Sequence, residues 1–116
     1  MDEAAVREHA QQMCDALVAG DVERAIADVS DELRRNLGEV VGLLPLPVTE
    51  AEIESIERGG SSLNVVVRLL GQSDEVRVQT RWKDRDGRPR IVEASHLSRT
   101  ARAEPIEEVE TSQGEA

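Results

Sequence analysis

The spacing of apolar residues changes part-way along the chain, and this change constrains the fold more than any other feature. Val6, Ala10, Met13 and Leu17 recur at helical intervals, as in a helix with one buried face. From residue 63 onward apolar residues recur at every second position, which is the period of a strand. A chain of 116 residues forms one domain by size. We therefore predict an α+β domain in which N-terminal helices pack on an antiparallel sheet.

Capping residues divide the N-terminal part into two or three helices. Gly20 supplies a left-handed end for the first helix, and Asp21 can cap a short second helix. Ser30 can cap a third helix, which Pro45 stops. The third helix would carry one long apolar stripe, formed by Leu33, Leu37, Val40, Val41 and Leu44.

A turn at residues 71–74 joins two of the predicted strands. It pairs Leu69 with Val76, Val67 with Val78, Val65 with Thr80 and Leu63 with Trp82. Because one face is then almost wholly apolar, the pattern supports this register.

The next hairpin turns at residues 86–87, and the last strand spans residues 89–97. A plain two-residue turn would place Trp82 opposite Ile91 and turn the Glu93 carboxylate toward the core. A one-residue bulge would instead pair Trp82 with Val92, Thr80 with Ala94 and Arg81 with Glu93. We prefer the bulge because it keeps the carboxylate out of the core and beside a guanidinium.

Residues 48–58 allow two interpretations. Residues 49–52 fit a helix capping box, with Ile53 and Ile56 following at helical spacing. The same stretch also alternates with a period of two, as an edge strand does. We favour the strand, since residues 59–62 then form a hairpin loop into the next strand and complete a four-stranded antiparallel sheet.

The charge and the rarity of aromatic residues exclude several classes of partner. The net charge is -10, which argues against the basic surface of a nucleic-acid binder and against binding to anionic lipid. Trp82 is the sole aromatic residue, so no platform for stacking bases can form.

The single cysteine, Cys14, rules out an internal disulfide and favours a reducing compartment. The N-terminus lacks the order of a signal peptide, and no apolar run is long enough to span a bilayer. We expect a cytoplasmic protein with no membrane partner.

From about Arg99 the strand pattern ends, and acidic and small residues follow. We predict a domain over residues 1–98 and a flexible acidic tail over 99–116.

Two segments resemble the nuclear transport factor 2-like superfamily. Residues 16–25, Ala-Leu-Val-Ala-Gly-Asp-Val-Glu-Arg-Ala, are similar to its helix-Gly-Asp-helix opening, and residues 81–93 are similar to its last hairpin. The resemblance spans roughly residues 5–98 in the order of elements. It implies a cystatin-like fold, in which a curved sheet wraps around a long helix and forms a cone. The chain has fewer strands than longer members, so the cone would be shallow or filled.

The superfamily contains enzymes and non-enzymes, so the resemblance leaves the function open. The sequence has no Tyr, so the oxyanion hole of ketosteroid isomerase-like members cannot be carried over. Cyclase-like and dehydratase-like members use His and Asp pairs in the cone. His96 is then the candidate general base, since the bulged register turns it to the face of Val78 and Ala94. The alternative, which we favour, is that His96 lies partly exposed at the sheet rim without a catalytic role, and His9 is expected at the surface. The predicted pocket residues are Cys14, Val78, Thr80 and Trp82.

The opposite sheet face mixes apolar and basic residues. Arg68 lies opposite Arg77, which is unfavourable unless a carboxylate lies between them. Glu52 and Glu54 could supply it, from the neighbouring strand or from a partner subunit. We expect this face to form a homodimer, with a solvated surface as the alternative. The predicted interface residues are Val66, Arg68, Arg77, Arg81 and Glu93, and further apolar area would come from Leu70, Ile91 and Leu97.

Two His and one distant Cys offer no zinc spacing, and the turn at Asp84 and Asp86 lacks the remaining ligands of a calcium loop. We expect no metal and no cofactor. The sequence therefore predicts a module for binding a small apolar ligand or for dimerisation. The alternative is a small lyase, isomerase or cyclase that uses His96 for acid-base catalysis.

Overall fold

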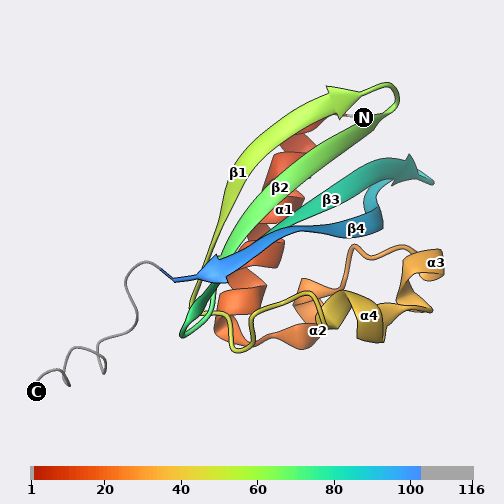
Figure 1. Ribbon diagram of the computed structural model, residues 1–116. Coiled ribbons are helices and arrows are strands. Elements are labelled where there is room, and N and C mark those ends of the chain that lie inside the picture. The colour runs from red at the N-terminus through yellow and green to blue at the C-terminus, as the bar shows by residue number, and fades with distance from the viewer. Residues whose placement is uncertain (1, 103–116) are drawn as a thin grey trace, which may run out of the picture.

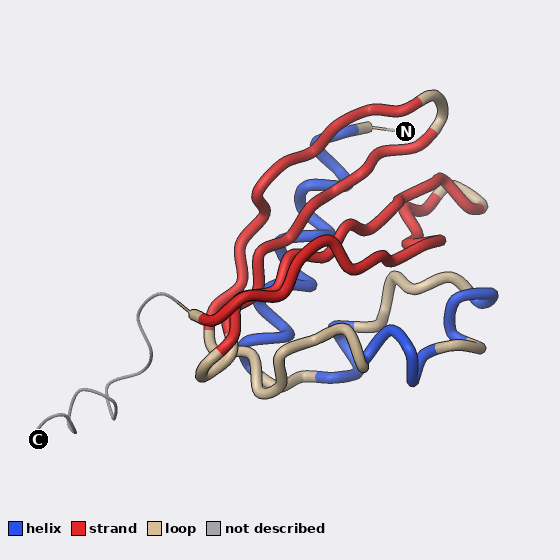
Figure 2. The backbone as a smooth tube through the Cα atoms, viewed as in Figure 1, coloured by secondary structure: helices blue, strands red, loops and turns tan. Residues whose placement is uncertain are grey.

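The computed structural model describes residues 2–102 and has the predicted α+β architecture (Figures 1 and 2). The elements follow in the order α1 (Glu3–Ala19), α2 (Val22–Ala25), α3 (Asp31–Arg34), α4 (Leu37–Val41), β1 (Glu50–Gly59), β2 (Ser62–Leu70), β3 (Asp74–Arg85) and β4 (Arg88–Ala101). The strands form one antiparallel sheet in the order β1-β2-β3-β4. None of the described helices is both long and apolar enough to cross a membrane.

Helix α1 begins and ends where its capping residues predict. The Asp2 carboxylate accepts a hydrogen bond from the Ala4 N–H at 3.1 Å, and Gly20 ends the helix in the left-handed conformation with φ 77°. Val6, Ala10 and Met13 of the predicted apolar stripe are buried, with Cys14 beside them, and Leu17 is half-buried. Figure 1 shows α1 lying along one face of the curved sheet. We call this the inner face and the opposite one the outer face.

The predicted second cap is confirmed, and the predicted third cap starts a much shorter helix than expected. Asp21 Oδ1 accepts from the Arg24 N–H at 3.2 Å, and Ser30 Oγ accepts from the Leu33 N–H at 3.2 Å. The single helix expected over the stripe 33–44 is wrong, because the chain forms α3 and α4 with a break between them. Asn36 takes non-helical angles in this break, φ -116° and ψ 32°, and asparagine and glycine both have low helix propensity.

The register between β2 and β3 is confirmed at all four predicted pairs. Residues 50–59 form strand β1, as favoured from the hairpin loop that follows. A bulge at Glu54 interrupts β1, and it places both Ile53 and Ile56 opposite inward-facing residues of β2. These two isoleucines, three residues apart, therefore both pack against the core.

The bulge predicted between β3 and β4 exists, but it lies one position away from the predicted one. Thr80 pairs with Ala94 and Arg81 with Glu93 as expected, whereas Trp82 pairs with Ile91 and not with Val92. The hairpin turn itself is a plain two-residue turn, and Val92 is the extra residue. Ile91 lies on the inner face, where its backbone forms two hydrogen bonds with the turn after α2. The Ile91 N–H donates to Asp28 O at 2.7 Å, and Ile91 O accepts from the Ser30 N–H at 2.9 Å. A second bulge, at Leu97, was not predicted.

Strand β4 continues to Ala101, so the predicted strand end at Leu97 is too early. The Arg102 N–H donates to Ser73 O at 2.8 Å, and its guanidinium donates to Thr49 Oγ1 at 3.0 Å and to Gly71 O at 2.9 Å. The sequence pattern fades before this point because β4 is an edge strand whose last residues are exposed. The remainder of the predicted tail, residues 103–116, lies outside the described residues.

The core fills the space between the inner face and the helices. Its largest fully buried side chains are Trp82, Leu63 and Leu69, and Val6 and Cys14 of α1 pack into the same cluster. Trp82 Nε1 donates to Thr80 Oγ1 at 2.9 Å, so its one polar atom is satisfied inside the core. This core places the sheet and the helices around the cavity described next.

Candidate functional site

A small cavity lies between the inner face of the sheet and the helices, and its volume is about 70 Å³. The strands supply its floor: Val67, Leu69, Val78, Thr80, Ile91 and Ala94. Its roof comes from α1, from α2 and from residues of the segment 33–44. We refer to it below as the apolar cavity.

The apolar cavity offers a ligand no free hydrogen-bonding side chain among the described residues that line it. Thr80 is the one polar residue of this lining. Its hydroxyl donates to Val65 O at 2.9 Å and accepts from Trp82 Nε1 at 2.9 Å. Both roles of the hydroxyl are thus already filled within the protein. The chemistry of the cavity is that of a hydrocarbon environment.

Of the four predicted pocket residues, Val78 and Thr80 line the apolar cavity, whereas Cys14 and Trp82 do not. Cys14 and Trp82 are fully buried and belong to the packed core beside the cavity. Burial, and to a lesser extent the charges of Asp15 and Glu52, raise the pKa of the Cys14 thiol to about 12. Cys14 is therefore a protonated packing residue at neutral pH, without the thiolate that reactive cysteines use.

His96 does not occupy the enclosed position that catalysis would require. It pairs with Val78 across the sheet as the bulged register requires, yet its side chain is exposed to solvent and it does not line the apolar cavity. An edge strand has a neighbouring strand on one side only, which leaves such a side chain open to water. His96 therefore takes the exposed position at the sheet rim, not the enclosed position that the catalytic hypothesis requires.

The sequence analysis missed a buried carboxylate that joins three elements. Asp28 is buried, and its Oδ2 lies 3.0 Å from His9 Nδ1 on α1, while its Oδ1 accepts from Arg90 Nη1 of β4 at 3.1 Å. Arg90 also donates to Ala27 O at 3.2 Å. The expectation that His9 is a surface residue is therefore only half right, since it is partly exposed and bound to Asp28.

This cluster of His9, Asp28 and Arg90 connects α1, the turn after α2 and β4. None of its three side chains lines the apolar cavity. The carboxylate has a partner on each oxygen, which is the usual arrangement for a buried structural charge. The partners lie 19 and 62 residues away in the sequence, so no local pattern could have indicated the cluster.

A second, larger hollow of about 580 Å³ lies between α3 and the hairpin of β3 and β4, and it is polar. Its lining includes Arg34, Arg85, Arg88 and Arg90 together with Asp31, Glu32 and Asp86. The pKa of the Glu32 carboxyl is lowered, first by a hydrogen bond from its own backbone and also by the nearby charge of Arg85. Because opposite charges are mixed throughout the lining, this hollow does not select a ligand of one sign.

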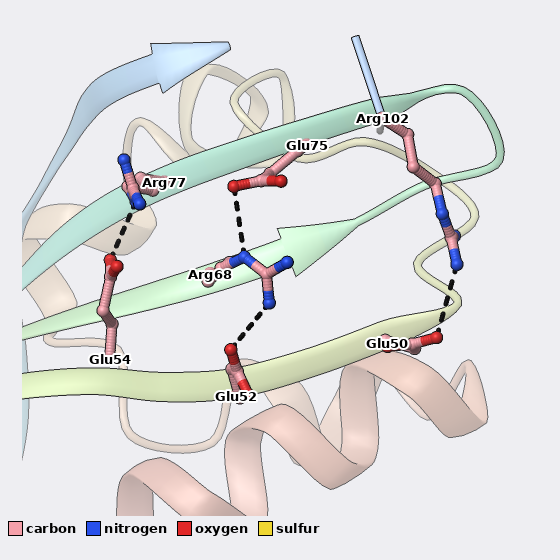
Figure 3. A network of polar contacts seen from close by, with 7 residues as sticks. All are labelled: Glu50, Glu52, Glu54, Arg68, Glu75, Arg77 and Arg102. Atoms are coloured by element: carbon pink, nitrogen blue, oxygen red, sulfur yellow. Dashed lines mark hydrogen bonds and ion pairs between the residues drawn. The ribbon is translucent and has the colours of Figure 1, made fainter. Parts of the chain in front are cut away.

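The outer face carries a set of ion pairs in which each of the two opposed arginines is paired with a predicted carboxylate (Figure 3). Arg68 contacts Glu52 at 2.7 Å and Glu75 at 3.1 Å, and Arg77 Nε lies 2.9 Å from Glu54. The hydrogen bonds of Arg68 to Glu75 and to Glu52 raise the pKa of Arg68. The carboxylates come from other strands of the same chain, so no partner subunit is needed to supply them.

The outer face exposes less apolar area in the structure than the sequence predicts. Leu70 is buried, and Ile91 faces the core opposite Trp82, so neither adds exposed area to this face. Val66 is half-buried, and Leu97 at the second bulge is 50% exposed. Arg81 pairs with Glu93 at 3.2 Å, as the register predicted. The outer face is therefore dominated by paired charges.

Among residues 2–102 no group of three or more His, Cys, Asp or Glu side chains is arranged to hold a metal ion. Comparison with known proteins finds no family model that matches the chain and no matching curated relative. A function must therefore be argued from the geometry of the chain itself.

Proposed function

We propose that this domain is a non-catalytic binding module that holds a small apolar molecule between the inner face of its sheet and its helices. The observation that carries the proposal is the apolar cavity, whose single polar lining residue, Thr80, has its hydroxyl satisfied within the protein. Protein interiors contain few voids larger than a water molecule, so an apolar hollow lined by both the sheet and the helices is a natural place for a ligand.

The same observation speaks against acid-base catalysis in this cavity. General acid-base chemistry needs a titratable group within hydrogen-bond reach of the substrate. No titratable residue of the described chain lines the cavity, and His96 is exposed outside it. A lyase, isomerase or cyclase mechanism that uses His96 therefore lacks an enclosed substrate site at that residue.

The roof of the cavity can adapt to a ligand more easily than its floor. Neither α3 nor α4 contains a buried residue, whereas the floor strands carry the centre of the core. Elements with little buried surface open at low free-energy cost. A cavity of about 70 Å³ holds roughly two waters at liquid density, so a larger molecule requires such an outward shift of the roof.

Membership of the nuclear transport factor 2-like superfamily is part of the proposal. The order of one long helix, short helices and a four-stranded antiparallel sheet supports it. A position of the apolar cavity between α1 and the concave sheet agrees with the cone that this resemblance implies. Cytoplasmic localisation stays a prediction from the sequence.

Xenon provides a direct test, because it is apolar, small and unable to form hydrogen bonds. We expect dissolved xenon to shift the methyl NMR signals of Val78 and Ile91, which line the cavity. Ala94→Leu places extra methyl groups in the floor and should abolish these shifts. Ala101→Leu is the matched control, since Ala101 is exposed on the same strand and should leave the shifts unchanged. Absence of shifts in the unmodified protein would identify the cavity as a closed packing defect.

Self-association through the outer face is a second proposal. Its support is that the helices leave this face of the sheet uncovered in the described chain (Figure 1). Charge pairs such as Arg81 with Glu93 can exchange partners across a two-fold axis, because an isologous interface brings the same patch to both sides. Arg81→Glu, which places a like charge beside Glu93, should weaken this association while sparing the core of the monomer.

A further inference from the structure

A second apolar hollow lies directly behind the roof of the apolar cavity. It is a surface groove of about 120 Å³ between the end of α1, α2 and the segment 41–46. The groove and the cavity share five lining residues: Leu17, Ala25, Ile26, Val41 and Leu44. One layer of side chains thus separates the interior cavity from a groove that is open to solvent.

The rim of the groove carries apolar side chains that the fold leaves in water. Val22 is 65% exposed and Leu46 is 59% exposed, and both line the groove. They are among four large hydrophobic residues that are exposed in the described chain. Exposed apolar residues gathered at one groove are a common mark of a binding site. Here they lie on the side of the shared wall that faces the solvent.

Much of the shared wall comes from short elements with little buried surface, which open at low free-energy cost. Helix α2 has four residues, of which Ala25 is buried, and α4 has no buried residue. A small displacement of this wall would join the groove and the cavity without disturbing the strands below. The joined space would be small, because its two parts hold about 70 and 120 Å³.

The charge at the groove favours one kind of polar group on the ligand. Asp21 is the sole charged residue among the described residues that line the groove, and the net charge of the chain is -10. Asp21 accepts a backbone hydrogen bond as the cap of α2, which fixes its carboxylate at the groove. A cationic or neutral group is compatible with this site, whereas a second carboxylate would be repelled.

We propose that the groove is the entrance to the apolar cavity, and that the ligand is a short aliphatic molecule with an amine or hydroxyl group. This inference rests on the proposed binding function. The hydrocarbon part passes the wall at Leu17 and Ile26 toward Val78, and the polar group stays at the groove beside Asp21.

Titration of the full-length chain with n-octylamine, followed by methyl NMR, tests this inference. We expect the signals of Val22 in the groove and of Val78 in the cavity to shift together with one dissociation constant. n-Octanol should bind as well, while octanoate should bind about tenfold more weakly than the amine because of Asp21. Leu46→Ser should weaken n-octylamine binding about five- to tenfold through the apolar area removed from the rim.

Val18→Ser is the matched control, since Val18 is 44% exposed near the end of α1 but does not line the groove. It should leave n-octylamine binding unchanged. Three results would each overturn the inference. Val18→Ser could weaken n-octylamine binding as much as Leu46→Ser does, or octanoate could bind as tightly as n-octylamine. The third is a shift of the Val22 signals without a shift of the Val78 signals. If xenon reaches the cavity but n-octylamine does not, the entrance is wrong and the binding function stands. If xenon does not bind and n-octylamine shifts Val22 alone, both are wrong.

Discussion

Trp82, Thr80 and Val65 are linked by two buried hydrogen bonds that connect β3 to β2. Trp82 is fully buried, its Nε1 donates to Thr80 Oγ1 at 2.9 Å, and that hydroxyl donates to Val65 O at 2.9 Å. Trp82→Ala removes the ring and leaves a large void, so we expect the free energy of unfolding to fall by about 3–5 kcal/mol. Because the variant has no aromatic residue, urea unfolding should be followed by far-ultraviolet circular dichroism.

Trp82→Phe separates packing from hydrogen bonding at this position. It keeps most of the ring but removes the donor, while Thr80 can still donate to Val65, so it should cost less stability than Trp82→Ala. In the unmodified protein the tryptophan emission should be blue-shifted, as expected for a buried indole. An emission maximum typical of tryptophan in water, or a Trp82→Ala cost below about 1 kcal/mol, would contradict this placement.

Cys14 makes stability depend on pH in the alkaline range. Burial raises its pKa from 9.0 to about 12 in the folded state, so folding favours the protonated thiol. The resulting stability is complete below pH 9 and is lost as the pH rises toward about 12. The sequence has no Tyr, and Lys83 is its one lysine, so few other side chains titrate there. The loss should approach about 1.4 kcal/mol per pH unit.

Urea unfolding of the protein and of Cys14→Ala at several alkaline pH values measures this effect. The variant should show a much flatter dependence of its unfolding free energy on pH above 9, whatever its stability at neutral pH. Native Cys14 should also react slowly with a thiol reagent at pH 8 and quickly after unfolding. Parallel pH curves for the two proteins would show that the thiol does not carry the alkaline loss.

At the scale of elements, strand β1 shows why its sequence fitted two structures. Ile53 and Ile56 are three residues apart, which is helical spacing, yet both face the core because the bulge at Glu54 adds one residue between them. Nothing in the local sequence marks that bulge. The strand is correctly favoured by the loop at residues 59–62, which leads directly into β2, and the family resemblance supports the same choice.

The two inner strands were predictable because their pattern is redundant. Four pairs of residues between β2 and β3 all place apolar or half-apolar side chains on one face, so a shift by one residue would expose all of them. In β4 the position of the bulge depends on the backbone bonds of Ile91 to the turn at residues 28–30. Such contacts between distant segments leave no periodic signal in the sequence.

The same contrast applies to the candidate site. Val78 and Thr80 line the cavity as predicted, since strand alternation alone decides which face they occupy. The groove that shares the wall of the cavity was not foreseen, because it depends on how α2 and the segment 41–46 fold over α1. For His96, alternation gives the face of the sheet correctly, but it does not say whether any helix covers that residue.

The Arg102 side chain forms hydrogen bonds that connect the end of β4 with the start of β1 and with the turn after β2. Its side chain is 14% exposed and donates to Thr49 Oγ1 and Gly71 O, with Glu50 at 3.3 Å. Arg102→Met removes these bonds and leaves buried acceptors unsatisfied, so we expect a loss of about 1–3 kcal/mol in unfolding free energy. Hydrogen exchange of the amides near Gly71 should accelerate as well.

Arg99→Met is the matched control on the same strand. Arg99 pairs with Asp74 at 2.6 Å, but this pair is more exposed to solvent, so its removal should cost at most about 1 kcal/mol. Similar costs for both variants would mean that Arg102 is no more than another surface arginine. In that case the ordered domain would end earlier than Ala101.

At the scale of the whole molecule, the two faces of the sheet differ in chemistry. The inner face is apolar and covered by helices (Figure 1). The outer face carries the ion pairs of Arg68 and Arg77 (Figure 3) and that of Arg81 with Glu93. Since these arginines already have partners within the chain, a dimer gains energy only by exchanging pairs and covering Val66 and Leu97. Homodimerisation through this face stays a prediction, and a stable interface would have to bury at least about 1,000 Å² in total.

Arg81→Glu tests the prediction with little risk to the fold. Arg81 and Glu93 are 42% and 64% exposed, so their pair contributes at most about 1 kcal/mol to the monomer. In a two-fold interface the substitution places like charges together on both sides, so the effect on association is doubled. Sedimentation velocity at micromolar concentration should show a dimer for the unmodified chain and a monomer for Arg81→Glu. Arg7→Glu, which alters an exposed pair on α1, should remain dimeric. A monomeric unmodified chain, or a dimer that Arg81→Glu leaves intact, would mean that the outer face is a solvated surface whose charges serve only their own chain.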